Sequence, residues 1–281
     1  MSRTRPLAAV AALAAATLVP ASAADARPAD AQAQSAKATT ILMSGSTSVY
    51  PLAVKLATAF IHKYPGHAKF KISQGGSDTG INDVAHKRVS IGDSSRDLEQ
   101  GDPGGLVFSK IARDGVCVVT NPSNQIANFT QQQVQDIFSG AVRRWDDVQG
   151  AKITGPIDLV SRTAASGTQD AFRNIFMGPN LNIAPSASQK ASNGLVQAAI
   201  RSDKQAVGFV DFQFTAGTFA VPYKGIGCTL ANAKSGQYPG MRNFWFVTNG
   251  KPTGVVKKFV NYTRSSSVQR SIVAKSYVTY R

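Results

Sequence analysis

The chain has 281 residues, 43% of them hydrophobic and 17% charged, which is enough for one or two domains with a sizeable core. This composition, with 24 glycines and 13 prolines, excludes disordered, collagen-like and coiled-coil chains, because its apolar share is too high for them. The formal net charge of +15 favours anionic ligands, but the basic residues are scattered, so no nucleic-acid partner is expected.

The N-terminus has the features of a secretory signal peptide. Arg3 and Arg5 precede an uncharged stretch over residues 7–19, and Ala21-Ser22-Ala23 provides a small-x-small cleavage pattern. We therefore expect residues 1–23 to be a signal peptide and residues 24–38, rich in alanine and glutamine, to be a disordered leader. No cysteine lies near the cleavage point, so we expect an exported protein, periplasmic or extracellular, that is not lipid-anchored.

From residue 39 onward, short β-branched runs alternate with helical periods, which predicts an α/β fold. An apolar helical face follows Pro51, and Thr130 with Gln133 forms a capping box for a helix that ends at Gly140. Thr253 is the expected N-cap of a helix near the C-terminus. The other expected helices carry Ile81 and Val84, and Phe172, Ile175 and Phe176; the expected strands are residues 41–43, 70–73, 89–91, 116–120, 157–161 and 244–248.

The chain contains two cysteines, Cys117 and Cys228. Two cysteines exclude a disulfide-dense scaffold and a zinc site built from four thiolates. In an exported chain, a disulfide between them would close a loop of about 110 residues. Two buried thiols fit the sequence equally well, so both alternatives stay open.

Three segments share one pattern, in which a strand leads through a cluster of Ser, Thr and Gly into a helix. The clusters are residues 44–48, 75–80 and 162–168. The first N–H groups of a helix lack internal partners and carry partial positive charge, so such a helix start attracts an anion. N-capping alone explains a single cluster. Three of them predict a site for a tetrahedral oxyanion.

Arg162 is the most informative residue of these clusters, because it lies four residues before Ser166-Gly167-Thr168. A guanidinium binds two oxygens of one anion at once, which a lysine cannot do. A surface ion pair is the alternative role. The position of Arg162 in the third cluster favours contact with a ligand.

These motifs resemble those of the phosphate-binding proteins, the soluble receptors of phosphate ABC importers. The first two clusters look like the first two ligand loops of that family, and Arg162 to Thr168 looks like its Arg-x-x-x-Ser-Gly-Thr loop. The resemblance runs from about residue 39 to the C-terminus. The other matching stretches are residues 114–122, 129–140 with Trp145, and 235–239.

The resemblance implies a two-lobed type II periplasmic-binding-protein fold whose lobes, joined by crossover strands, close on the ligand. It implies a first lobe made of residues 39–114 and 242–281 and a second lobe made of residues 115–241. Both cysteines would then lie in the second lobe, which favours their pairing. The implied function is capture of inorganic phosphate for the membrane permease of an ABC importer, by a monomer without catalytic residues, metal or cofactor. The implied phosphate ligands are Ser46, Thr47, Ser77, Ser95, Arg162, Ser166, Gly167 and Thr168.

One position departs from the family pattern. Ser95 stands where many members have an aspartate, which accepts the proton of hydrogen phosphate and thereby disfavours sulfate. A serine both donates and accepts, so it discriminates less. Asp78 is a candidate for the missing acceptor, although N-capping is its alternative role. Arg96 follows Ser95 and is expected to contact either the ligand or a neighbouring acid.

Three other functions remain as alternatives. The first is a receptor for sulfate or another tetrahedral oxyanion. The second is a secreted phosphoesterase with Ser77 or Ser166 as nucleophile. The third is a polyanion-binding protein that uses its basic surface. A nucleophilic serine needs a nearby base, and the sequence shows none. His62, His67 and His86 do not have the spacing of a metal site.

Overall fold

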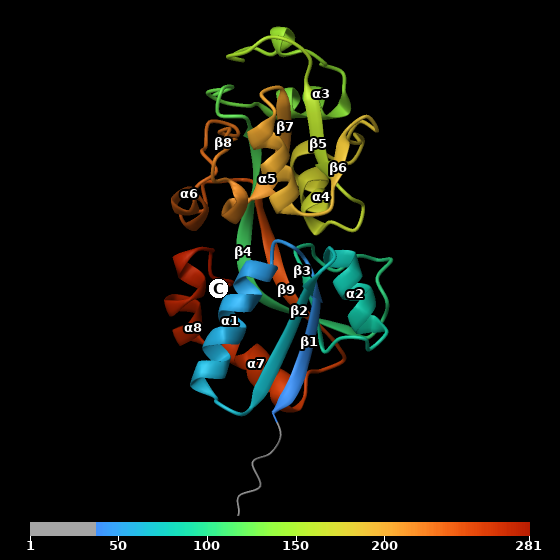
Figure 1. The fold of residues 1–281 in the computed structure, drawn as a ribbon, viewed down its shortest axis with the longest axis vertical. Helices are drawn as coiled ribbons and strands as arrows, with labels where there is room; N and C mark the ends of the chain where they lie inside the picture. The colour runs from blue at the N-terminus through green and yellow to red at the C-terminus, as the bar shows by residue number, and fades with distance from the viewer. Residues whose placement is uncertain (1–37) are drawn as a thin grey trace, which may run out of the picture. The chain divides into compact units, whose positions relative to one another are not determined.

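Two groups of strands and helices are joined by two long strands in the computed structural model, which describes residues 38–281 (Figure 1). The expected signal peptide, and the expected leader apart from its last residue, lie outside the described residues. None of the helices within residues 38–281 has the length and apolarity that a membrane crossing requires.

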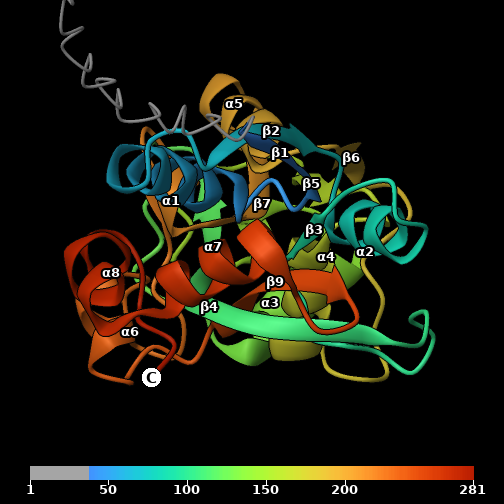
Figure 2. The ribbon, with the colours of Figure 1, turned by 90° about the horizontal axis from the view of Figure 1, so that it is seen from below.

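The first group, which we call lobe 1, combines an N-terminal βαβαβ unit with helices from the C-terminus. Parallel pairing joins β1 to both β2 and β3, so the carboxyl ends of these strands lie at one edge of the sheet. Helices α1, α7 and α8 cover one face and share a hydrophobic core, whereas α2 covers the other face (Figures 1 and 2). The elements are β1 (Thr39–Gly45), α1 (Tyr50–Lys63), β2 (Ala68–Gln74), α2 (Ser77–Ala85), β3 (Ile91–Ser94), α7 (Gly254–Arg264) and α8 (Ser266–Ser271).

The second group, lobe 2, has its own hydrophobic core, built from residues between Val116 and Met241. Its strand β5 is parallel to β6 and β7. The buried rings of Phe172 and Phe209 stack on each other, and the Phe138 ring packs against Phe172 at a tilt. The elements are α3 (Gln131–Ser139), β5 (Asp158–Arg162), α4 (Gly167–Phe172), β6 (Ser188–Lys190), α5 (Asn193–Ser202), β7 (Ala206–Asp211), β8 (Phe219–Ala220) and α6 (Leu230–Lys234).

The two lobes share the antiparallel strands β4 (Leu106–Thr120) and β9 (Met241–Asn249). Their register pairs Asp114 with Arg242 and Gly115 with Met241, at the level where one hydrophobic core ends and the other begins. The strand order is therefore continuous, β2-β1-β3-β9-β4-β7-β5-β6, across both lobes. The chain crosses between the lobes twice, as the resemblance implies.

Most of the expected elements are present, with instructive differences. The capping box of Thr130 and Gln133 forms, and Gly140 ends α3 in the left-handed conformation. Thr253 is the N-cap of α7, but its side chain makes no capping hydrogen bond. Val89 lies outside β3, because a turn with Lys87 at φ 58° follows α2 and delays the strand. The sequence analysis did not predict α5 or the short buried strand β7.

Cys117, on β4, and Cys228 form a disulfide in lobe 2. Their sequence separation is 111 residues, so the bond connects the crossover strand with the segment that precedes α6. Of the two alternatives that the sequence left open, the structure has the disulfide.

Replacing both cysteines by serine should lower the free energy of unfolding by about 2–4 kcal/mol, because the unfolded chain regains the freedom of a long loop. Thermal and denaturant unfolding of the non-reduced proteins measure this difference. Reduction of the wild type should give a similar loss and should leave the double variant unchanged. Equal stability of all these forms would contradict the bond.

Candidate anion-binding site

The starts of several helices meet between the two lobes. In lobe 1, β1 leads into the turn before α1 and β2 leads into α2, while in lobe 2 β5 leads into α4. Because parallel strands end at the same edge of a sheet, the polar residues after them are brought together there. The three Ser/Thr/Gly clusters of the sequence are these connections.

Gly45 permits the close approach of β1 to β3 that this arrangement needs. It has a φ of 135°, and a Cβ atom at this position would collide with the backbone of Asp93. The N–H group of Ser46, the next residue, donates a hydrogen bond of 2.9 Å to the Asp93 carbonyl. Only glycine meets both requirements without strain.

Three buried serines of lobe 1 form a chain of hydroxyl groups. Ser46 Oγ donates to Ser95 Oγ over 2.9 Å, and Ser95 Oγ lies 3.2 Å from Ser77 Oγ. All three side chains are at most 3% exposed. They come from three separate connections, and each hydroxyl can rotate its proton toward or away from a ligand.

Lobe 2 packs directly against this chain of hydroxyl groups. The Thr168 hydroxyl lies 3.1 Å from that of Ser48, and Gly167 faces the side chains of Ser77 and Ser95. Ser166 Oγ caps α4 by accepting the N–H of Thr168 at 3.2 Å. Lobe 2 therefore reaches the hydroxyl groups of lobe 1 through the start of α4.

Arg162, at the end of β5, is the buried cation of the site, with 1% of its surface exposed. Its Nε donates to the Lys190 carbonyl at 3.0 Å, and its Nη2 donates to the Ala191 carbonyl at 3.0 Å and to Thr47 Oγ1 at 3.2 Å. Its Nη1 is buried without a hydrogen-bond partner among the described residues. Burial, and next the charge of Arg242, lower the pKa of Arg162 to about 10, so it remains charged at neutral pH.

The structure thus brings together all eight residues that the resemblance implied as ligands. Three further polar side chains, which the sequence analysis did not assign to the site, lie among them. Asn193, at the start of α5, donates to Ser48 Oγ at 2.8 Å and to Thr47 Oγ1 at 3.1 Å. Arg242 donates to Ser48 Oγ at 2.8 Å and approaches Ser95 Oγ at 3.4 Å.

The sequence contained a signal for two of these three residues. Ser48 directly follows the expected ligands of the first cluster, and Arg242 is the one charged residue in the apolar segment 241–248. Nothing in the sequence pointed to Asn193, because the analysis did not predict its helix.

The crossover strands place a compact ionic group beneath the site. Arg242 Nη2 lies 2.9 Å from Asp114 Oδ2 and 3.7 Å from Asp211 Oδ2, and both carboxylates are fully buried. Burial is the main cause that raises the pKa of each carboxyl group, and the charge of Asp211 raises that of Asp114 further. Such groups retain a proton more readily than exposed acids, which weakens their compensation of the buried charges of Arg162 and Arg242. An anion between the lobes would complete this compensation.

Asp78 and Arg96 form an ion pair with each other. Arg96 Nε donates to the Asp78 carboxylate at 2.8 Å, and its Nη2 lies 2.7 Å from Asp102. Of the two partners expected for Arg96, the structure shows the acid. Asp78 is 37% exposed and engaged by Arg96, so the geometry does not support it as the missing acceptor beside Ser95.

Arg96 also contributes to the contact between the lobes. Its Nε lies 3.8 Å from the Asp170 carboxylate of α4, and the Asp78 N–H donates to the Ala165 carbonyl at 3.2 Å. Burial, and then the charges of Asp78 and Glu99, raise the pKa of Asp170 to about 6. These contacts link the rims of the two lobes beside the hydroxyl groups.

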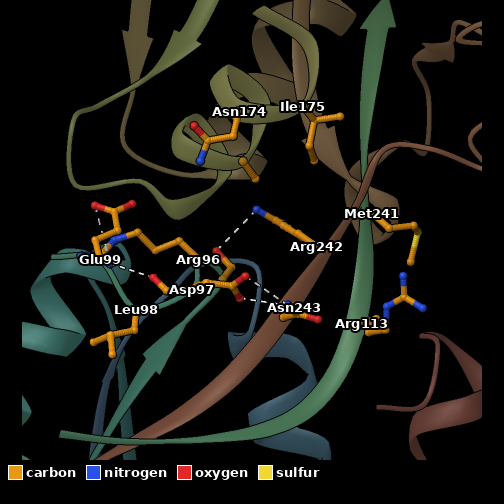
Figure 3. A pocket seen from close by; sticks show the side chains of 12 residues that line it. Arg96, Asp97, Leu98, Glu99, Arg113, Asn174, Ile175, Met241, Arg242 and Asn243 are labelled. Carbon is orange, nitrogen blue, oxygen red and sulfur yellow. Dashed lines mark hydrogen bonds and ion pairs between the residues drawn. The ribbon is translucent and has the colours of Figure 1, made fainter. Parts of the chain in front are cut away.

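A pocket of about 340 Å³ opens next to the site, where the lobes meet the crossover strands (Figure 3). Ser95 and Arg242 belong both to its wall and to the site. Figure 3 shows the Arg242 side chain reaching from its strand toward lobe 1, between Arg96 and Asn174. The remaining wall residues are Asp97, Leu98, Glu99, Arg113, Ala171, Ile175, Met241 and Asn243.

The chemistry of the site fits binding better than catalysis. Ser77 Oγ is hydrogen-bonded to Ser95, and Ser166 Oγ accepts backbone N–H groups, so neither serine has a base beside it in the part of the chain that the structure describes. No group of His, Cys, Asp and Glu side chains within residues 38–281 is arranged to hold a metal ion. Hydroxyl groups and guanidinium groups are donors for an oxyanion.

A two-lobed α/β fold with a buried polar site between its lobes defines the class of the type II periplasmic binding proteins. A family model described as a PBP superfamily domain matches residues 30–267, and the chain belongs to this superfamily. The fold class expected from the sequence is confirmed.

Individual relatives support the same classification. The chain is 28% identical to the phosphate-binding protein PstS of Bacillus subtilis (strain 168) over 241 residues, which cover 83% of this chain and 78% of the relative. A Clostridium perfringens protein, described as a phosphate ABC transporter substrate-binding protein and solved with bound phosphate, has a TM-score of 0.80 and 30% identity. The match covers 86% of this chain and 100% of that one. An ABC-type phosphate transport receptor from Vibrio cholerae has a TM-score of 0.69 and 27% identity, with coverages of 85% and 99%.

Gly167→Ala should hold the lobes apart. The new Cβ would lie 2.9 Å from Ser95 Oγ and 3.0 Å from the Arg96 backbone nitrogen, both in the opposite lobe. Small-angle X-ray scattering with excess orthophosphate, the anion bound by the Clostridium relative, should give the variant a larger radius of gyration than the wild type.

Gly194→Ala is the matched control, because its Cβ would meet other atoms only at 3.8 Å. Both variants should keep the melting temperature of the wild type within a few degrees. An unchanged radius of gyration for Gly167→Ala would show that this contact does not govern closure.

Proposed function

We propose that the protein is an extracytoplasmic solute-binding protein that captures inorganic phosphate between its lobes for delivery to an ABC importer. The observation that carries the proposal is the buried Arg162, whose Nη1 has no protein partner in the described chain and points to an anionic ligand. The phosphate-bound relative and the PstS relative support the choice of anion. Membership in the superfamily supports the role as a receptor.

The dimensions of the site favour a small ligand with many acceptors. The hydroxyl groups of Ser48 and Thr168 face each other across the lobes at 3.1 Å, so little space separates the lobes there. Each charge-assisted hydrogen bond contributes about 1.5–3 kcal/mol. Several of them supply the roughly 8 kcal/mol of micromolar binding. We therefore assign ligand contacts to Ser46, Thr47, Ser77, Ser95, Arg162, Ser166, Gly167 and Thr168, and add Asn193 and Arg242 as side chains that orient the hydroxyl groups.

Selectivity for phosphate over sulfate rests on hydroxyl groups in this protein. Ser95 is held between the hydroxyl groups of Ser46 and Ser77, and each of these can turn a lone pair toward a P–OH proton. Sulfate is aprotic at neutral pH and has no proton for such an acceptor. In this proposal, the three serine hydroxyl groups take the place of the aspartate found in many phosphate-binding proteins.

We place its action outside the cytoplasm. The expected signal peptide and the receptor class of the relatives support export to a periplasm or to the medium. The fold supports action as a monomer, since both halves of the site come from one chain. A membrane permease is then the partner that receives the phosphate.

Isothermal titration calorimetry of the purified protein should show saturable binding of orthophosphate with a stoichiometry of one. Excess sulfate should leave the titration nearly unchanged, because hydrogen phosphate can both donate to and accept from the serine hydroxyl groups, whereas sulfate can only accept. Equal competition by sulfate would reject phosphate specificity in favour of a general oxyanion receptor. Release of nitrophenol from its phosphate ester, abolished by Ser166→Ala, would instead revive the phosphoesterase alternative.

Arg162→Ala should weaken phosphate binding at least tenfold, the loss of about one charge-assisted hydrogen bond. The control is the titration of the Arg173→Ala variant, which lacks an exposed arginine at the end of α4. This variant should bind phosphate as the wild type does. An unchanged isotherm for Arg162→Ala in a correctly folded protein would place the ligand elsewhere.

A further inference from the structure

The charges of the chain are divided unevenly along the sequence. Residues 39–77 contain four basic residues and no acidic residue, and residues 212–281 contain ten basic residues and no acidic residue. These two segments supply α1, α7 and α8. The acids of lobe 1 come instead from α2, from β3 and β4, and from the segment between these two strands.

The structure gathers the acid-free segments on one side of lobe 1. Helices α1, α7 and α8 pack on the same hydrophobic core and lie on the same side of the sheet (Figures 1 and 2). Together with the turn over Val273–Lys275, they form what we call the basic face. Its charged side chains are Lys55, Lys63, Lys257, Lys258, Arg264, Arg270 and Lys275.

Within residues 38–281, none of these seven side chains is paired with a carboxylate. Three of them lie over aromatic rings. Lys258 Nζ is 4.0 Å from the centre of the Tyr64 ring, Lys63 Nζ is 5.7 Å from that of Tyr262, and Arg264 Cζ is 5.0 Å from that of Tyr280. Five of the seven side chains are exposed and the other two are partly exposed. The face therefore presents a field of one sign to solvent.

Helix α1 also exposes two aliphatic side chains. Val54 and Ile61 are 37% and 40% exposed, and their separation of seven residues places both on one stripe of α1. Lys55 and Lys63 lie on the same helix. Basic and aliphatic side chains together are typical of a helix that rests on an anionic lipid surface. A linear polyanion would neutralise the lysines but would leave the aliphatic side chains in water.

We propose that the basic face docks on a bilayer rich in anionic phospholipid, with α1, α7 and α8 toward the headgroups. This contact is separate from the ligand site, because none of the seven basic residues belongs to it. It holds the receptor near a membrane whether or not phosphate is bound.

The test uses the full chain and vesicles made of equal parts of phosphatidylglycerol and phosphatidylcholine, in a chloride buffer of low ionic strength. The protein should sediment with these vesicles, should not sediment with pure phosphatidylcholine, and should be released as the salt concentration rises. Lys257→Glu, Arg270→Glu and Lys275→Glu combined should lower the ratio of bound to free protein at least tenfold. Calorimetric phosphate binding should be unchanged in this triple variant.

The control combines Lys152→Glu, Arg201→Glu and Lys204→Glu, which change the net charge equally but lie in exposed positions of lobe 2. It should sediment almost as the wild type does. The proposal would be overturned if both triple variants lost vesicle binding equally. It would also be overturned if the wild type sedimented equally with charged and uncharged vesicles. Retention on heparin without vesicle binding would also overturn it and favour a polyanionic polymer. If the Lys257→Glu, Arg270→Glu and Lys275→Glu variant does not fold, glutamine at the same three positions gives the same comparison.

Discussion

A buried positive charge without a sufficient protein counter-charge is the constraint on which the site depends. Arg162 and Arg242 both lie in the interior, and the two carboxyl groups near them repel each other and are desolvated, so they retain a proton more readily than exposed acids. Moving a cation out of water is costly unless an anion or several acceptors replace the solvent. A bound oxyanion would supply this compensation, so ligand binding and closure of the lobes stabilise each other.

The fold places the donors for such an anion with little freedom of movement. Each ligand loop begins at the end of a strand and continues into a helix, and the strands of both lobes belong to one continuous order. Arg242 connects the crossover strands with the hydroxyl groups, because one guanidinium contacts Asp114, Ser48 and Ser95. A movement of the crossover strands would therefore shift Ser48 and Ser95, which lie between the lobes. The same chain carries further positive charge on the basic face of lobe 1, on residues that do not belong to the site.

Local signals in the sequence predicted much of this structure. The capping box at Thr130, the apolar face after Pro51 and the three Ser/Thr/Gly clusters depend on neighbours within a few residues, and each forms as expected. Residues whose role depends on distant partners were not predictable in this way. Asn193 reaches Thr47 and Ser48, which lie 146 and 145 positions earlier, and the sequence offers no measure of their distance in space. Arg96 lies directly after a ligand serine, yet tertiary contacts direct it to Asp78 and Asp102.

The central claim is that one small anion compensates the buried guanidinium groups between the lobes. A crystal structure of the protein grown with orthophosphate tests it most directly. The account predicts tetrahedral density in contact with Arg162 Nη1 and with hydroxyl groups from both lobes. Closed lobes with no anion at these atoms, or an anion bound only at the surface, would contradict it.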